Sequence, residues 1–64
     1  MTPARMIECL ETIGWTRRGV AARVGLSNTS FRRYEIGTAK VPDDIAAWLE
    51  KLAAAHERNP PPTR

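Results

Sequence analysis

The amino-acid sequence predicts an all-α protein, built as one small bundle of four helices. Apolar residues recur at intervals of three and four positions, which is the spacing of one helix face. No segment alternates apolar with polar residues, and no hairpin turn signal is present. The chain has 64 residues, so it forms one domain close to the lower size limit for independent folding. At about 0.05–0.15 kcal/mol per residue, its free energy of unfolding would be only about 3–10 kcal/mol.

The first two predicted helices carry their own start and stop signals. Thr2 is a good N-cap and Pro3 fits the first helical position, while Gly14 ends this segment. The apolar face of the first helix consists of Met6, Cys9, Leu10 and Ile13. Thr16 caps a second, shorter helix, which ends at Gly25.

Two further helices and a tail complete the predicted chain. Ser27 caps a third helix that ends near Gly37, and Pro42 opens a fourth helix after the loop TAKVP. The apolar stripe of the fourth helix consists of Ile45, Trp48, Leu49 and Leu52. Alanines between positions 46 and 55 give this helix a narrow second face. We therefore expect one domain over residues 1–58 and a disordered, proline-rich tail over residues 59–64.

Positive charge is concentrated in the middle third of the chain. The whole chain has a net charge of +3. Between Arg17 and Lys40, six Lys or Arg residues stand against a single acidic residue, Glu35, a local balance of +5. The rest of the chain has four basic and six acidic residues. Such a basic segment indicates a polyanionic partner.

The remaining composition argues against an enzyme, a metalloprotein or a membrane protein. Cys9 is the only cysteine, which excludes an internal disulfide and a cysteine-based zinc site. His56 has no partner at metal-ligand or catalytic spacing, and no carboxylates are paired for acid–base chemistry. No stretch has the length of a membrane span, and the N-terminus lacks the apolar run of a secretion signal. We expect a cytoplasmic protein with no metal, cofactor or small-molecule ligand, in which Cys9 is a small buried hydrophobe.

The segment GLSNTSFRRYEIG, residues 25–37, has two different faces when it is wound as a helix. Ser30, Phe31 and Tyr34 fall within about 100° of one another and form the inward face. A separate arc of about 140° carries Asn28, Thr29, Arg32 and Arg33. Within residues 27–35 this arc contains only side chains that can form hydrogen bonds, and none is acidic. A merely solvated surface is the alternative, although such a surface usually carries both signs of charge.

The second helix is linked to the third by a spacing pattern. Ala21 is small enough for two helices to cross closely, and Gly25 tolerates the backbone conformation of a tight turn. The apolar residues that can then share one core are Val20, Val24, Leu26, Phe31 and Tyr34. This is the helix-turn-helix arrangement, in which the second helix enters the major groove of DNA.

Residues 16–37, TRRGVAARVGLSNTSFRRYEIG, resemble the helix-turn-helix of the phage Cro/cI repressors and the wider Xre family. The matching positions are Ala21, Gly25, Ser27, Arg33, Tyr34, Glu35 and Gly37. The chain departs from the family at Arg17 and Arg18, where glutamine or acidic residues are common, and at Gly19, which is unusual inside a helix. The resemblance implies a lambda-repressor-like bundle, a fold that often has five helices where the residues here indicate four.

The resemblance and the basic arc together predict a sequence-specific regulator of transcription that binds double-stranded DNA. It would be a nucleoid-associated repressor of phage or mobile-element type that acts by promoter occlusion. Arg33 is expected on guanine O6 and N7, Asn28 on adenine N6 and N7, and Thr29 on a thymine methyl group. The residues expected at the DNA backbone are Arg17, Ser27, Arg32, Thr38 and Lys40.

One reading helix offers too few contacts for tight specific binding, so we expect a homodimer and an inverted-repeat operator. The expected dimer surface lies on the fourth helix and includes Leu52, Ala54 and Ala55. Trp15 and Trp48 are expected in the core, and Arg23 is expected on the surface or in a salt bridge. The alternative function is an antitoxin-like or other protein-interaction module, which would use the fourth helix and the tail. RNA binding is disfavoured because exposed aromatic residues for base stacking are lacking.

Overall fold

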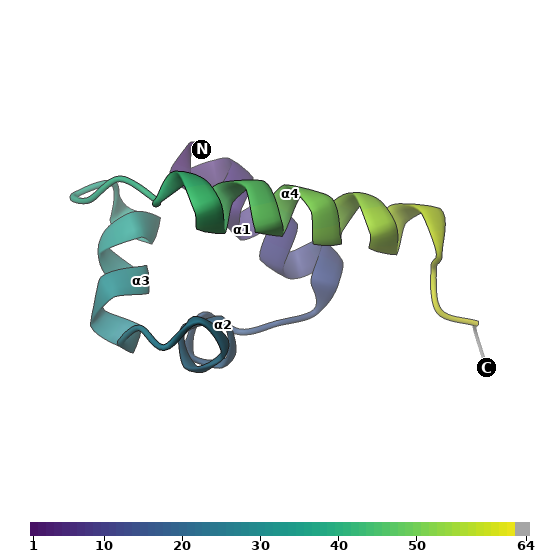
Figure 1. The fold of residues 1–64 in the computed structure, drawn as a ribbon, viewed down its shortest axis with the longest axis horizontal. Helices are drawn as coiled ribbons and strands as arrows, with labels where there is room; N and C mark the ends of the chain where they lie inside the picture. Colours follow the sequence, from purple (N-terminus) through teal and green to yellow (C-terminus); the bar gives the residue numbers. More distant parts are fainter. Residues whose placement is uncertain (63–64) are drawn as a thin grey trace.

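The computed structural model describes residues 1–62 and contains four α-helices. They are α1 (Pro3–Ile13), α2 (Arg17–Val24), α3 (Asn28–Ile36) and α4 (Asp43–Arg58). α1 and α4 pack side by side, and α3 and α2 form the other side of the bundle (Figure 1). No strand and no fifth helix occur within the described residues, so the predicted four-helix, all-α fold is confirmed. No helix in residues 1–62 is long and apolar enough to cross a membrane.

The first three helices begin and end where the capping residues predict. The Thr16 hydroxyl accepts a hydrogen bond from the Gly19 N–H at 3.0 Å, and Thr2 and Ser27 cap α1 and α3 in the same way. Each of these helices stops at a glycine whose φ lies between 74° and 86°: Gly14, Gly25 and Gly37. Local chemistry alone therefore fixes the two turns that flank α2.

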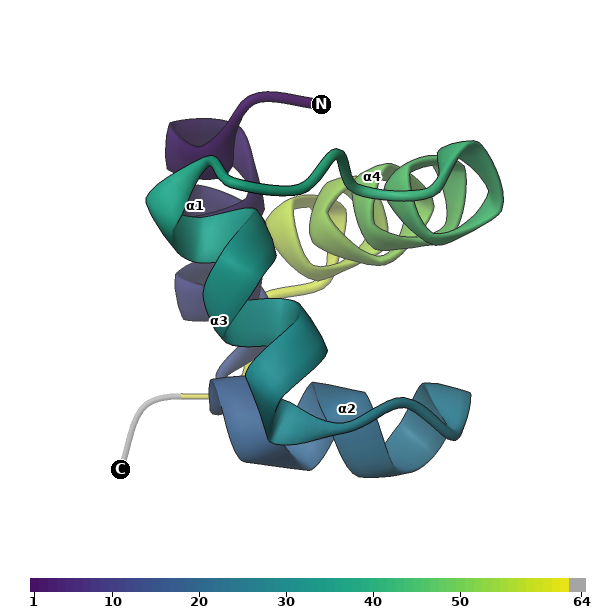
Figure 2. The ribbon, with the colours of Figure 1, turned by 90° about the vertical axis from the view of Figure 1, so that its left-hand side faces the viewer.

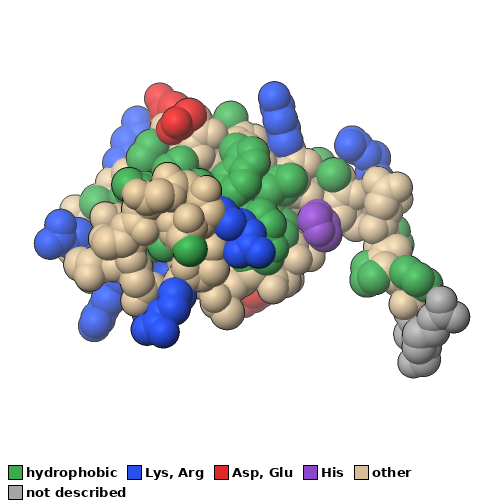
Figure 3. All heavy atoms as spheres, turned by 60° about the horizontal axis from the view of Figure 1, so that its bottom comes forward, with side chains coloured by type: hydrophobic (Ala, Val, Ile, Leu, Met, Phe, Trp, Pro, Cys, Tyr) green, Lys and Arg blue, Asp and Glu red, His purple; other side chains and the backbone are tan. Residues whose placement is uncertain are grey.

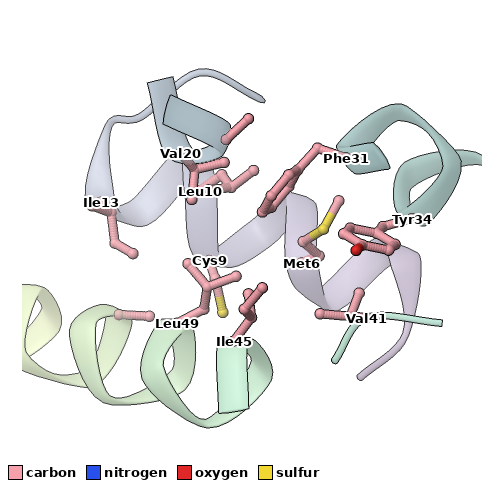
Figure 4. Close-up of a cluster of buried hydrophobic side chains, with 12 residues drawn as sticks. Met6, Cys9, Leu10, Ile13, Val20, Phe31, Tyr34, Val41, Ile45 and Leu49 are labelled. Carbon is pink, nitrogen blue, oxygen red and sulfur yellow. The ribbon is translucent and has the colours of Figure 1, made fainter. Parts of the chain in front are cut away.

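A single hydrophobic core joins all four helices (Figure 4). The core side chains without exposed surface are Met6, Cys9, Val20, Phe31, Leu49 and Ala53. α1 contributes four buried residues and packs against both α4 and α3. The prediction that Cys9 is a small buried hydrophobe is confirmed.

Two predictions about the core are wrong. Leu26 was expected in the core, but it is 38% exposed, because α2 and α4 do not pack extensively and leave its side chain at the edge of a groove.

In α4 the alanine face is not separate from the apolar stripe. Ala53 is fully buried, whereas Trp48 and Leu52 are only half-buried. The buried stripe of α4 therefore runs along Ile45, Leu49 and Ala53, the residues that face α1 and the core.

Trp15 and Trp48 pack against each other at the edge of the core. Their ring centroids are 5.6 Å apart, and both residues are half-buried. The guanidinium of Arg23 lies 4.2 Å from the centroid of the Trp15 ring, a cation–π contact. Arg23 Nη1 also donates a hydrogen bond to the carbonyl oxygen of Gly19 at 3.0 Å. Arg23 is exposed, as the first of its two expectations has it; within residues 1–62 it forms no salt bridge, and its guanidinium contacts the Trp15 ring instead.

Crowding explains why Gly19 occurs inside α2. A Cβ atom at position 19 would lie 3.1 Å from the Thr16 hydroxyl oxygen and 3.4 Å from Arg23 Nη1. The first contact is tighter than usual, so the N-cap side chain of Thr16 would have to shift by a few tenths of an ångström, whereas the second is an ordinary van der Waals contact. Glycine avoids that shift, at a cost in helix stability of about 0.5–1 kcal/mol relative to alanine.

A surface ion-pair group links α1 to α4. Arg5 Nε donates to Glu50 Oε1 at 2.8 Å, and the same guanidinium pairs with Glu8. The hydrogen bond from Arg5 holds the pKa of Glu50 below its ordinary value. Burial raises the pKa of the Cys9 thiol, whose Sγ lies 3.6 Å from Glu50 Oε1. These contacts tie together the two longest helices of the bundle.

α4 ends at Arg58, and the chain then leaves the bundle. The backbone N–H and the side-chain amide of Asn59 both donate to the carbonyl oxygen of Ala55. Residues 60–62 are exposed and not helical. Residues 63–64, which belong to the predicted disordered tail, lie outside the described residues.

Candidate nucleic-acid interface

α3 lies at an outer edge of the molecule and is anchored by one face. In Figure 2 it is the element nearest the viewer, with α1 behind it and α2 below it. Phe31 has no exposed surface and Tyr34 is 8% exposed. Their rings meet edge to face, with centroids 5.1 Å apart. The predicted inward face is therefore confirmed, and it fixes which side of α3 looks outward.

Most of the outward arc of α3 is in contact with solvent. Thr29, Arg32 and Arg33 are exposed, and Asn28 is half-buried. Within residues 1–62 neither Arg32 nor Arg33 forms an ion pair or a side-chain hydrogen bond. The arc thus presents two permanently charged donor groups and a hydroxyl, with no acidic residue among them.

Ile36 also belongs to this arc, although the sequence reasoning missed it. It follows Asn28 by eight positions, which places it about 80° around the helix, between Arg32 and Arg33. Its side chain is 62% exposed, the most exposed large hydrophobic residue in the described chain. Extending the helical winding by one residue beyond Glu35 would have found it. The arc therefore combines cationic donors with one apolar contact.

Arg17 is held by two partners on α3. Its Nη1 donates to Glu35 Oε2 at 2.8 Å, and its Nε donates to Asn28 Oδ1 at 3.1 Å. The side chains of Arg17 and Glu35 are 35% and 37% exposed. The first residue of α2 is thus connected to the first residue of α3 and to a carboxylate two turns further along that helix. Neither contact was predicted from the sequence.

The other residues expected at the DNA backbone differ in whether their polar side-chain groups already have a hydrogen-bond or ion-pair partner. The Ser27 hydroxyl accepts the Ser30 N–H at 3.1 Å, so it serves as the N-cap of α3. The Thr38 hydroxyl donates to the carbonyl oxygen of Arg33 at 3.4 Å, at the end of that helix. The Lys40 side chain is 80% exposed, and its Nζ is 3.9 Å from Oδ1 of Asp43, whose side chain is 92% exposed. Arg32 and Lys40 are therefore the most available of the set.

The surface between α2 and α4 is hollowed and apolar. A groove of about 390 Å³ is lined by Val24, Leu26, Pro42, Asp44, Ile45 and Trp48. Figure 3 views the molecule from this side, with hydrophobic side chains gathered near the centre and Lys and Arg side chains projecting around them. Leu26, which lines the groove, directly precedes Ser27, the N-cap of α3.

The residues expected at a dimer surface lie near the C-terminal end of α4. Ala54 and Ala55 are half-buried, and Leu52 is half-buried with its side chain packed against the core. The Leu52 side chain is therefore already packed against the core of its own subunit. The exposed neighbours of Ala54 one turn away are two acidic and two basic residues, Glu50, Lys51, Glu57 and Arg58.

No family model, curated protein or solved structure matches this chain.

Proposed function

We propose that this protein is a regulator of transcription that binds double-stranded DNA in a sequence-specific manner. The observation that carries the proposal is the outward arc of α3, which is cationic, rich in donors and uncovered, while Phe31 and Tyr34 anchor the opposite face. A helix held in this way can enter a major groove without rearranging the core. The short turn from α2, through Gly25 and Ser27, supports the same geometry.

Each polar side chain of the arc has a role that its chemistry suits. Arg33 would donate to guanine O6 and N7, and Thr29 would contact a neighbouring base or its methyl group. Asn28 would donate to a base edge from the amide group that Arg17 leaves available. Arg32 and Lys40 would hold the phosphates and fix the register of the helix in the groove. The mode of regulation would be repression by promoter occlusion.

Selection from a random pool of double-stranded DNA tests the proposal directly. We expect enrichment of one inverted repeat whose half-sites lie about one helical turn apart, about 34 Å, because each subunit carries one reading helix. The binding constant should fall steeply with salt, as expected for phosphate contacts. An unenriched pool, with binding that does not depend on sequence, would contradict the proposal.

Dimerisation through α4 is part of the proposal. Ala54 and Ala55 are small residues near the C-terminal end of α4, and small side chains allow two helices to approach closely. We expect Ala54→Glu to shift the mass toward the monomer in analytical ultracentrifugation. Ala22→Glu, at an exposed alanine of α2, is the matched control and should leave the mass unchanged. An unchanged mass for both variants would remove this face of α4 from consideration.

A protein-interaction module is the second candidate, and the groove between α2 and α4 favours it. Leu26 and Trp48 offer apolar surface there that the chain itself does not cover. Such a module, an antitoxin-like protein for example, would co-purify with one protein partner in a fixed ratio. Substitution of Leu26 by a charged residue would then abolish partner capture, and the random DNA pool would yield no enriched sequence.

A further inference from the structure

Glu35 stands apart from the other charged residues of the interface region. It is the single acid among residues 17–40, and it lies on the flank of α3 next to Asn28. Its carboxylate accepts from Arg17 Nη1, and the same guanidinium donates through Nε to Asn28 Oδ1. The three side chains therefore form one chain of charge-assisted hydrogen bonds that runs from a carboxylate to the first residue of the reading helix.

This chain of contacts fixes how Asn28 is presented. A guanidinium has only donors, so the Asn28 atom that faces Nε is the carbonyl oxygen. The amide nitrogen, the other branch of the same planar group, then offers its N–H donors away from Arg17. One oxygen lone pair is already in use, which weakens the two-bond pairing with adenine N6 and N7. Asn28 is thus predisposed to donate to acceptors such as purine N7, guanine O6 or thymine O4.

The same contacts change what Arg17 can do. A phosphate that approaches Arg17 must compete with a carboxylate already 2.8 Å away. The pair is also neutral, so Arg17 adds little to the attraction between the protein and DNA of any sequence. We therefore no longer expect Arg17 to be an independent phosphate contact. Its guanidinium instead orients Asn28.

We propose that Glu35 is a positioning residue that sets the specificity of this interface, and this inference rests on the proposed function. By holding Arg17, it orients the amide of Asn28 toward base acceptors and withholds one positive charge from indiscriminate binding to phosphates. Specificity improves on both counts, because the sequence-dependent contact is ordered and the sequence-independent attraction is reduced.

The test compares Glu35→Gln, Arg17→Gln and the double variant in binding to the selected operator and to random duplex DNA. Glutamine keeps the size of Glu35 and an acceptor oxygen but removes the charge. In Glu35→Gln we expect the salt slope for random DNA to steepen by about 0.9, which amounts to about 3.5-fold more affinity lost from about 50 to 200 mM salt. Base preference at the position under Asn28 should relax at the same time.

The double variant separates the proposed role from a general effect of charge. In the Arg17→Gln background, Glu35→Gln should leave both the slope and the base preference unchanged. Glu11→Gln, which removes an exposed carboxylate of α1, is the matched control for the loss of one negative charge. Equal steepening in the double variant, or no more steepening than in Glu11→Gln, overturns the inference. A wild-type protein that selects no sequence contradicts the proposed function itself.

A second measurement does not need DNA. In the free wild-type protein, the Arg17 Nε–H should give a resonance that exchanges slowly with water, because it donates to Asn28. In Glu35→Ala, which removes the acceptor oxygens, this resonance should broaden or exchange faster, while amide signals from Phe31 and Tyr34 report an intact fold. A slowly exchanging Nε–H in both proteins would show that Glu35 does not hold Arg17 in place, and it would overturn the inference whatever the DNA measurements give.

Discussion

Phe31→Ala is expected to remove a large share of the folding free energy of this protein. Phe31 has no exposed surface, and its ring contacts Tyr34 at the centre of the core. Truncation of a buried phenylalanine costs about 3–5 kcal/mol. A domain of 64 residues has only about 3–10 kcal/mol of stability in total, so this single change removes much or all of it. Urea denaturation followed by circular dichroism measures the loss.

Ile36→Ala is the matched control for Phe31→Ala. Both substitutions shorten a large apolar residue of α3, but Ile36 is 62% exposed. We expect its free energy of unfolding to change by about 0.5 kcal/mol or less, as is usual at exposed positions. If the two variants were destabilised equally, the assignment of the inward and outward faces of α3 would be wrong, and the candidate interface would lose its basis.

Arg33→Ala is expected to weaken binding to the selected operator by about 1–3 kcal/mol, or about 5- to 150-fold. The side chain is exposed and has no ion-pair partner within residues 1–62, so its donors are available to a guanine edge. The base preference at one position of each half-site should relax. Binding titrations against operators with each of the four bases at that position measure both effects.

The fold should survive the loss of the Arg33 side chain. The capping bonds at the end of α3 use the carbonyl oxygen of Arg33, which accepts from the Gly37 and Thr38 N–H groups, and alanine retains that oxygen. Arg18→Ala, at an exposed arginine of α2, is the matched control, and it should weaken binding to all DNA sequences by a similar, small factor. A uniform loss across sequences for Arg33→Ala would instead assign Arg33 to the DNA backbone.

Helix boundaries could be predicted because they depend on neighbouring residues. Thr16 and Gly25, for example, bound α2 by contacts that span three or four positions. Core membership was harder to predict where it depends on how distant helices pack. Leu26 has the right spacing for the core, yet it lies at the edge of a groove because α2 and α4 diverge. Periodicity identifies which residues can be buried, but not which helix covers them.

The residues of the candidate interface also fall into two groups: those that local helix geometry predicts and those that depend on how distant helices pack. The outward arc follows from helical geometry within a single segment, so Thr29, Arg32 and Arg33 could be located from the sequence. The contact between Arg17 and Glu35 joins residues 18 positions apart, and it depends on how α2 crosses α3. Counting charges along the sequence does not reveal that Arg17 is paired with Glu35. Ile36 could have been found, because its angle on the helix follows from its position alone.

The packing of α1 has a consequence for how two copies would span an operator. α1 contacts both α3 and α4, whereas α2 packs mainly against α3, so the tilt of α3 relative to α4 is set through α1. In the proposed pair joined through α4, the number of base pairs between half-sites would therefore depend on how the buried side chains of α1 pack against both helices. None of these side chains needs to touch the nucleic acid or the other subunit to alter that spacing.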